Sequence, residues 1–91
     1  MASIRIPMPL RKLTNEIDVV NTDAATLGEA VDKLETDFPG IKERIVYEKG
    51  EIRRFVNIYV NGDDVRFLDN LRTALKPGDE VSIVPAVAGG I

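Results

Sequence analysis

The sequence predicts an α+β domain in which a mixed sheet of about five strands packs on one main helix. Three observations support this: two strand-like segments lie before residue 21, one amphipathic helix follows, and a hairpin and a final strand come after residue 54. The chain has 91 residues, of which 44% are hydrophobic and 30% charged, enough for one modest core. We therefore expect a single domain over residues 1–91, with residues 85–91 as an exposed C-terminal tail.

The N-terminal part of the chain predicts a hairpin. Residues 3–6 form a strand-like segment that stops at Pro7 and Pro9, since proline cannot donate to a central ladder. Residues 16–20 alternate polar and apolar side chains, the pattern of a half-buried strand. Residues 11–15 between them are expected to form a polar turn.

The next segment has the signals of a helix. Thr26 and Glu29 fit a capping box, with Thr26 as the N-cap and the Glu29 side chain reaching back to free amides. Pro39-Gly40 is expected to end the helix, residues 41–46 to add a short helical turn, and residues 48–51 to form an exposed loop. Apolar residues at helical spacing make one stripe: Leu27, Ala30, Val31, Leu34 and Phe38.

Residues 55–68 predict a hairpin, because Asn61-Gly62 is a preferred two-residue type I′ turn. Folding the chain about this turn pairs Val60 with Asp63, Ile58 with Val65, and Val56 with Phe67. One face, which we expect to be buried, then carries Val56, Ile58, Val65 and Phe67, and the other carries Phe55, Asn57 and Tyr59.

The last segment predicts a helical turn over residues 71–75 and a tight turn over residues 76–79 with Pro77 in second position. Residues 80–85 form the final strand, with Val81 and Ile83 pointing inward. This order of elements is that of a β-grasp, in which the last strand lies centrally beside the first. The tail then leaves from a rigid base.

Composition excludes several classes of function. The chain has neither His nor Cys, so the commonest general base, nucleophile and transition-metal ligands are missing. The carboxylates Glu29, Asp32, Glu35 and Asp37 fit the solvated face of the helix. A net charge of −3 argues against nucleic acid as a partner. We expect no enzyme activity, and no metal or cofactor bound by this chain.

Membranes are not expected as partners either. No apolar run approaches the roughly 20 residues that span a bilayer, and the first residues lack the apolar core of a signal peptide. We expect a cytoplasmic protein.

The end of the sequence is its most informative part. Residues 84–91 carry no charge and no hydroxyl, and they include the glycine pair Gly89-Gly90. Glycines give a main chain thin enough to thread a narrow channel and to present a carboxylate to another protein's active site. Ala88, Gly89 and Gly90 are the candidate threading residues. The alternative is an end that is merely frayed.

These features together resemble the MoaD/ThiS family of ubiquitin-like sulfur carriers. Residues 55–61 and 75–81 are similar to that family's central strand and to the turn before its tail. Within the family, the chain is most similar to the CysO branch. That similarity rests on residues 54–61, 64–67 and 85–90, and on Thr26-Leu27-Gly28 at the helix start.

The resemblance implies a mechanism. An E1-like enzyme adenylates the carboxylate of Gly90, and a sulfur donor converts the acyl adenylate into a thiocarboxylate. In the CysO branch, a PLP-dependent enzyme resembling cysteine synthase takes up this sulfur, and a JAMM-type zinc metalloprotease releases the new cysteine. ATP, PLP and zinc belong to those partners.

Ile91 departs from the family's pattern, because it holds the Gly90 carboxylate in a peptide bond. We expect a protease to cut between Gly90 and Ile91, which makes these two residues the candidate processing site.

Other functions remain open at this point. The chain could be the small subunit of molybdopterin synthase, a carrier for thiazole synthesis, or a protein conjugated to lysines. It could also be a β-grasp interaction module without covalent chemistry. Its partner surface would then include Phe55, Tyr59 and Val87.

Overall fold

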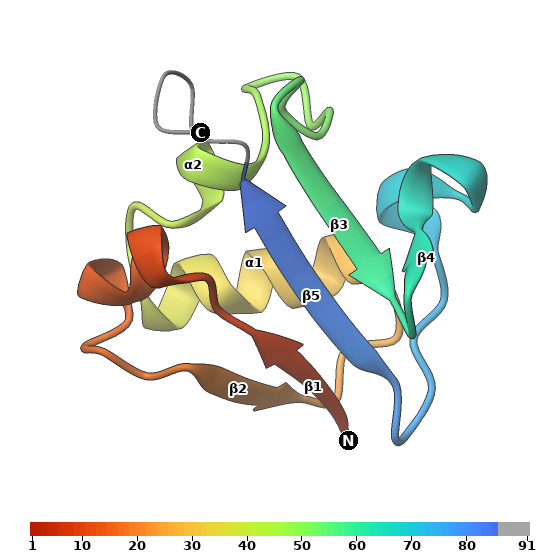
Figure 1. Cartoon of the computed structure of the whole chain (residues 1–91), viewed down its shortest axis with the longest axis horizontal. Coiled ribbons are helices and arrows are strands. Elements are labelled where there is room, and N and C mark those ends of the chain that lie inside the picture. Colours follow the sequence, from red (N-terminus) through yellow and green to blue (C-terminus); the bar gives the residue numbers. More distant parts are fainter. Residues whose placement is uncertain (86–91) are drawn as a thin grey trace.

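The computed structural model describes residues 1–85, and its centre is a five-stranded mixed sheet (Figure 1). The strands are β1 (Ala2–Arg5), β2 (Val19–Thr22), β3 (Val56–Val60), β4 (Asp63–Asp64) and β5 (Glu80–Pro85). Two α-helices, α1 (Leu27–Asp37) and α2 (Lys42–Ile45), accompany them, together with three 3₁₀ helices, η1 (Met8–Leu13), η2 (Val65–Phe67) and η3 (Asn70–Arg72).

The strand order is β2-β1-β5-β3-β4, so the last strand is central. β5 runs parallel to β1 and antiparallel to β3, and the β1–β2 and β3–β4 pairs are antiparallel. This confirms the predicted β-grasp, the N-terminal hairpin and the final strand over residues 80–85. β5 is therefore held by a ladder on each side.

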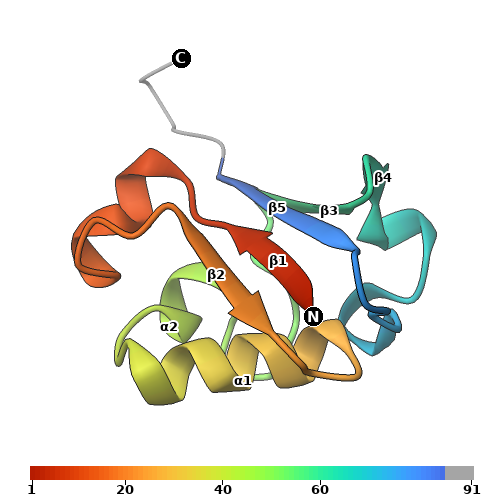
Figure 2. The ribbon, with the colours of Figure 1, turned by 90° about the horizontal axis from the view of Figure 1, so that it is seen from below.

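The core lies between the sheet and α1, which crosses one face of the sheet (Figure 2). Alternation along each strand sends Ile4, Ile58 and Val81 to this face, and all three are buried. The buried face of α1 consists of Leu27, Ala30, Val31 and Leu34, with Phe38 partly buried just beyond the helix. This is the apolar stripe that the sequence predicts.

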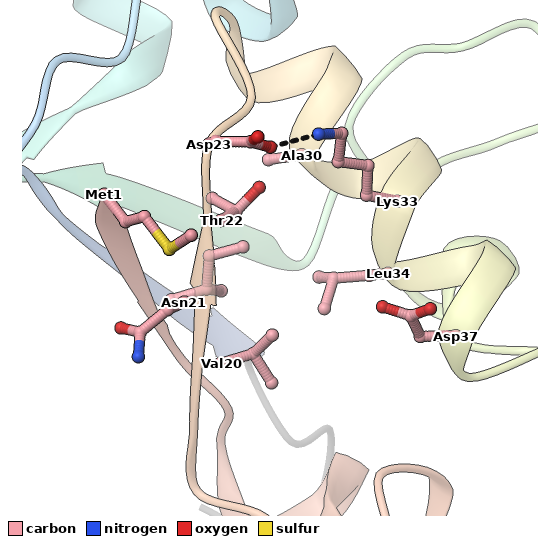
Figure 3. Close-up of a pocket in the computed structure, with 10 residues that line it drawn as sticks. Met1, Val20, Asn21, Thr22, Asp23, Ala30, Lys33, Leu34 and Asp37 are labelled. Carbon is pink, nitrogen blue, oxygen red and sulfur yellow. Dashed lines mark hydrogen bonds and ion pairs between the residues drawn. The ribbon is translucent and has the colours of Figure 1, made fainter.

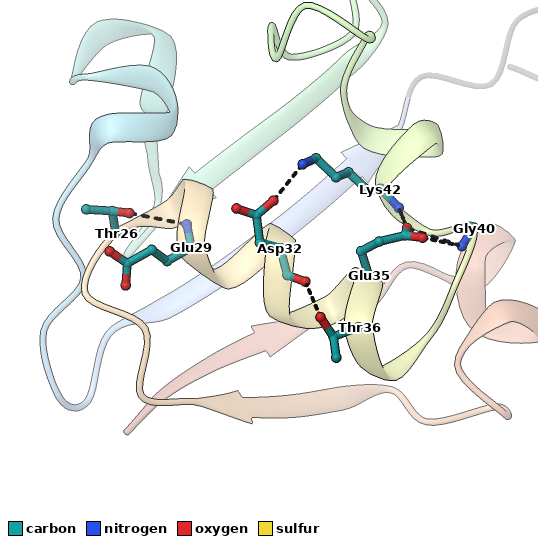
Figure 4. Close-up of polar contacts among 7 residues, drawn as sticks. All are labelled: Thr26, Glu29, Asp32, Glu35, Thr36, Gly40 and Lys42. Carbon is teal, nitrogen blue, oxygen red and sulfur yellow. Dashed lines mark hydrogen bonds and ion pairs between the residues drawn. The ribbon is translucent and has the colours of Figure 1, made fainter.

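Polar contacts hold α1 at its start and beside β2. Lys33 on the helix forms an ion pair with Asp23, which follows β2 (Figure 3). At the helix start, the Glu29 N–H donates to Thr26 Oγ1 at 3.2 Å (Figure 4), and the Glu29 carboxylate accepts from the Ala25 N–H at 3.2 Å. The predicted capping box is confirmed. The helix ends at Asp37, just before Pro39-Gly40, as expected.

The second strand differs from its prediction. It spans Val19–Thr22, and the expected polar turn over residues 11–15 is largely replaced by η1, which begins at Met8. Thr14 is buried and donates its hydroxyl to the carbonyls of Arg11 and Ile17, which curls the chain here. Asn15 and Glu16 follow with φ of 54° and 66°, outside the range of a strand. The alternation over residues 16–20 was therefore misleading.

The prediction of the central hairpin is correct at its turn and wrong beyond it. Asn61 and Gly62 have φ of 52° and 89°, as type I′ requires, and Val60 pairs with Asp63. β4 then ends after Asp64, whose carboxylate accepts from the Arg66 N–H at 2.9 Å and starts η2.

The predicted Ile58–Val65 and Val56–Phe67 pairs therefore do not form. Ile58 pairs with Ile83 of β5 and Val56 with Pro85. Val65 is still buried, but Phe67 is 88% exposed, so its assignment to the core was wrong.

The remaining local predictions hold with small shifts. The segment after η2 contains η3, and the expected short helix over residues 41–46 is α2. Residues 48–51 form a loop that is exposed except at Gly50. In the turn before β5, the Asp79 N–H donates to the Lys76 carbonyl at 3.0 Å, and Gly78 has φ of 89°, as a type II turn requires.

Candidate functional site

The candidate site begins where β5 ends. Pro85 is the last described residue, and it pairs with Val56 on β3, while Val84 pairs with Asn57. On the other side of β5, Ser82 pairs with Arg5 on β1. The base of the tail is thus the end of a central strand that β1 flanks as far as Ser82 and β3 as far as Pro85. The predicted site residues that follow it lie outside the described residues, and these are Val87, Ala88, Gly89, Gly90 and Ile91.

Arg66 stabilises the strand beside this base. Its guanidinium donates to the Asn57 side-chain oxygen at 2.8 Å and to the carbonyls of Val56 and Arg53 at 2.7 and 2.9 Å. β4 pairs only with Tyr59 and Val60, so Arg66 supplies donors to the part of the β3 edge that β4 does not reach. It thereby holds the residues that pair with Val84 and Pro85.

Sequence reasoning missed this role of Arg66. The sequence places residues 64–67 in a hairpin strand and in the family resemblance, and it indicates no separate role for Arg66. The available signal for a capped 3₁₀ turn was Asp64 shortly after the hairpin turn, because an Asp side chain can accept from the backbone N–H two residues on.

Apolar side chains are exposed next to the tail base. Phe55, just before β3, is 61% exposed, and Val84 is 46% exposed. The β5 alternation places Val84 on the face away from α1, opposite Asn57, and Phe55 lies in the turn just before β3. Tyr59 lies further along this face and is half-buried. The use of Phe55 and Tyr59 as a partner surface stays a prediction, and Val84 belongs with them by position.

The carboxylates of α1 are engaged in local structure (Figure 4). Asp32 pairs with the Lys42 ammonium at 2.6 Å. Glu35 accepts from the N–H groups of Lys42 at 2.9 Å and Gly40 at 3.1 Å, and these hydrogen bonds lower the pKa of the Glu35 carboxyl. Over residues 1–85, no group of three or more acidic side chains is placed to hold a metal ion.

None of the helices within residues 1–85 is long and apolar enough to cross a membrane.

Comparison with known proteins adds to this geometry. A family model described as the ThiS family matches residues 4–90. The sulfur carrier protein CysO of Mycobacterium tuberculosis is 46% identical over 90 residues, covering 97% of this chain and 97% of that protein. Small archaeal modifier protein 3 of Haloferax volcanii is 44% identical over 68 residues, covering 75% of this chain and 73% of that protein.

A solved structure is similar over the whole fold. A chain in the crystal structure of the Amycolatopsis orientalis BexX/CysO complex superposes with a TM-score of 0.92 at 42% identity, covering 99% of this chain and 100% of that chain. The chain therefore belongs to the ThiS family of ubiquitin-like sulfur carriers, as its motifs indicated, and it is similar to CysO proteins over nearly its full length.

Proposed function

We propose that this chain carries sulfur as a thiocarboxylate on Gly90 and donates it for cysteine biosynthesis. The observation that supports this most is the 46% identity to CysO over 97% of both chains. The family match also ends at Gly90, one residue before Ile91. The central β5 fits the proposal because its pairing with β3 as far as Pro85 gives the tail a fixed starting point.

The chemistry requires a free carboxylate at Gly90. A carboxylate oxygen attacks the α-phosphorus of ATP and pyrophosphate leaves, which gives an acyl adenylate. A sulfur nucleophile then attacks the acyl carbon and AMP leaves. With hydrosulfide as the nucleophile, the new C–S bond replaces the C–O bond to AMP, one proton is lost, and the sulfur remains as a thiocarboxylate. This chain supplies only the acyl group, so it acts as a substrate of partner enzymes rather than as an enzyme.

Processing comes first in this scheme. Hydrolysis of the peptide bond between Gly90 and Ile91 frees the carboxylate that the activating enzyme needs. The zinc metalloprotease expected in the pathway already cleaves after Gly90 when it releases cysteine, so the same enzyme can perform both cuts. ATP, PLP and zinc are all bound by the partner enzymes in this proposal.

The partners are expected to meet the exposed apolar side chains around the tail base. Phe55 and Val84 lie beside the point where the tail leaves the sheet, with Tyr59 on the same face and Val87 two residues beyond Pro85. An enzyme that receives the tail in a channel necessarily brings its surface close to these side chains. Burying these apolar side chains supplies affinity for the partner enzyme.

ATP–pyrophosphate exchange with the E1-like enzyme tests the proposal. The chain ending at Gly90 should support exchange, and the chain that retains Ile91 should not. The matched control is a chain that ends at residue 90 and carries Gly90→Val. It presents a free carboxylate on a branched residue, which the narrow channel of the enzyme should reject. Equal exchange by the forms with and without Ile91 contradicts the processing step.

A second candidate function uses the same glycine. The 44% identity to small archaeal modifier protein 3 favours attachment of Gly90 to lysine side chains of other proteins. Digestion of conjugates followed by mass spectrometry separates the two functions, since only conjugation leaves an isopeptide-linked glycine on a lysine.

A further inference from the structure

The Asn61-Gly62 turn is tied to the start of β5 by hydrogen bonds. The Asn61 N–H donates to the Glu80 carbonyl at 2.8 Å, and the Asn61 side-chain oxygen accepts from the Glu80 N–H at 2.9 Å. The side-chain NH₂ of Asn61 donates to a carboxylate oxygen of Asp79 at 3.0 Å. The hairpin turn and the turn before β5 are therefore joined at the end of the sheet opposite Pro85 (Figure 1).

These partners fix the direction of the Asn61 amide. A main-chain N–H only donates and an ionised carboxylate only accepts, so the amide oxygen faces Glu80 and the amide nitrogen faces Asp79. The hydrogen bond from Asn61 lowers the pKa of the Asp79 carboxyl, so this group is ionised at neutral pH. The second oxygen of Asp79 accepts from the Lys76 N–H at 2.8 Å. Both ends of the Asn61 amide and both oxygens of Asp79 are thus engaged.

Asn61 is also the only asparagine of the chain that a glycine follows. In such a pair, the glycine nitrogen can attack the asparagine amide carbon, because glycine has no Cβ that shields this nitrogen. The attack closes a succinimide and releases ammonia, which takes the side-chain nitrogen and the proton of the glycine N–H. Water then opens the succinimide to aspartate or isoaspartate. Asn61 and Gly62 are both exposed, so water reaches this site.

The folded structure opposes this reaction at Asn61. Before the amide carbon can reach the Gly62 nitrogen, the side chain has to turn away from Glu80 and Asp79, and both of its hydrogen bonds have to break. The reaction therefore proceeds from molecules in which the junction between the two turns has opened. The product does not fit the junction, since an aspartate at position 61 lacks the NH₂ and places a second carboxylate against Asp79.

We propose that Asn61 is a deamidation site that the junction with Asp79 and Glu80 protects, and that its conversion to aspartate hinders the junction from closing again. A molecule that opens at this end of the sheet is thereby marked permanently. The junction also includes β1, because the Ser3 N–H donates to the Asp79 carbonyl at 2.9 Å. Deamidation therefore weakens the end of three neighbouring strands, β1, β5 and β3. The proposal does not depend on the sulfur chemistry.

Peptide mapping of the full chain after incubation at mildly alkaline pH measures the reaction. Trypsin cleaves after Arg54 and Arg66 and releases residues 55–66. Mass spectrometry of this peptide detects the replacement of NH₂ by OH at residue 61. Asn57 in the same peptide is an internal reference, because Ile58 rather than glycine follows it. The parent chain should deamidate at Asn61 about tenfold or more slowly when folded than when unfolded in urea.

A variant of Asp79 separates the effect of the junction from that of the turn. Asp79→Asn has one side-chain oxygen in place of two, so it cannot replace both the bond to Lys76 and the bond to Asn61. This variant should speed deamidation of folded protein about tenfold or more. The matched control is Asp63→Asn, which removes an exposed charge from the same hairpin. It should leave the rate within about twofold of the parent.

Thermal melts test the consequence of the modification. Asn61→Asp should lower Tm, because two carboxylates then face each other. Combining Asn61→Asp with Asp79→Asn exchanges the two groups, so the carboxylate at position 61 again faces an NH₂. This double variant should melt above both single variants, an outcome that independent losses at the two positions cannot produce.

Three results overturn the proposal: equal deamidation of Asn61 in folded and urea-unfolded parent chain, a rate in Asp79→Asn no higher than in Asp63→Asn, or a double variant that melts no higher than Asn61→Asp alone. The comparison of folded with unfolded parent chain requires no variant, so it decides the proposal even if Asp79→Asn fails to fold.

Discussion

Replacing Arg66 by methionine tests how the base of the tail is held. Arg66→Met keeps a long apolar stem but removes three charge-assisted hydrogen bonds of 2.7–2.9 Å to the start of β3. Hydrogen bonds to charged groups contribute about 1.5–3 kcal/mol each, although bonds to one group do not add and half-exposed carbonyls regain water. We therefore expect the variant to lose about 2–3 kcal/mol of unfolding free energy.

Urea denaturation followed by far-UV circular dichroism measures this loss. In a thermal melt, at roughly 4–8 °C per kcal/mol for a domain of this size, the Tm of the variant should fall by about 10–20 °C. The matched control is Arg54→Met: Arg54 is exposed, and its side chain makes no hydrogen bond or ion pair with another residue of the described chain. Amide exchange should also accelerate at residues 56–58 in the Arg66 variant. Equal stability of the two methionine variants refutes the role given to Arg66.

Three further changes test the packing and charge of the domain. Ile58→Ala empties a fully buried position and should cost about 2–5 kcal/mol in chemical denaturation, while Tyr59→Ala should cost clearly less; the reverse ranking means that the strand register is wrong. Gly28→Ala brings a Cβ to 3.1 Å from the Leu71 carbonyl oxygen and should therefore lower Tm. The same change in an open helix stabilises the helix by about 1 kcal/mol, so a higher Tm shows that the Leu71 backbone moves aside at little cost. Glu35→Gln should lower the urea midpoint at pH 7, because the hydrogen bonds to Glu35 depress its pKa in the folded state only. That deficit should shrink as the pH falls below the usual glutamate value of 4.5, and a deficit independent of pH assigns the effect to packing.

The elements that the sequence predicted well are those with local causes. Thr26 and Glu29 cap α1 through their own side chains, and Asn61-Gly62 sets its turn through backbone preference alone. Val81 and Ile83 alternate in a strand that is paired along its whole length. Each signal lies within a few residues, so no knowledge of the rest of the fold was needed.

The errors come from contacts between distant residues. The hairpin turn fixes the first pair of β3 and β4 but not their length, and the hydrogen bond between Asp64 and Arg66 ends β4 after two residues. The place of Phe67 on the surface follows from that early ending. Arg66 acts on carbonyls 10 and 13 residues away, which become neighbours only after folding.

The candidate site also contains residues that a local motif identifies and residues that only the folded structure brings together. Gly90 and its neighbours could be identified from a motif, because the chemistry depends on the glycines themselves. The nearness of Phe55, just before β3, to Val84 on β5 required the β3–β5 register.

Intact-mass spectrometry of the protein purified from the cells that produce it tests the central claim most directly. The proposed function predicts a species that ends at Gly90 and is heavier than the plain carboxylate form by the replacement of one oxygen with sulfur. Treatment with an alkylating reagent should label this species, because a thiocarboxylate is nucleophilic at sulfur. A population that retains Ile91 throughout and carries no sulfur, in cells that are actively making cysteine, contradicts the claim.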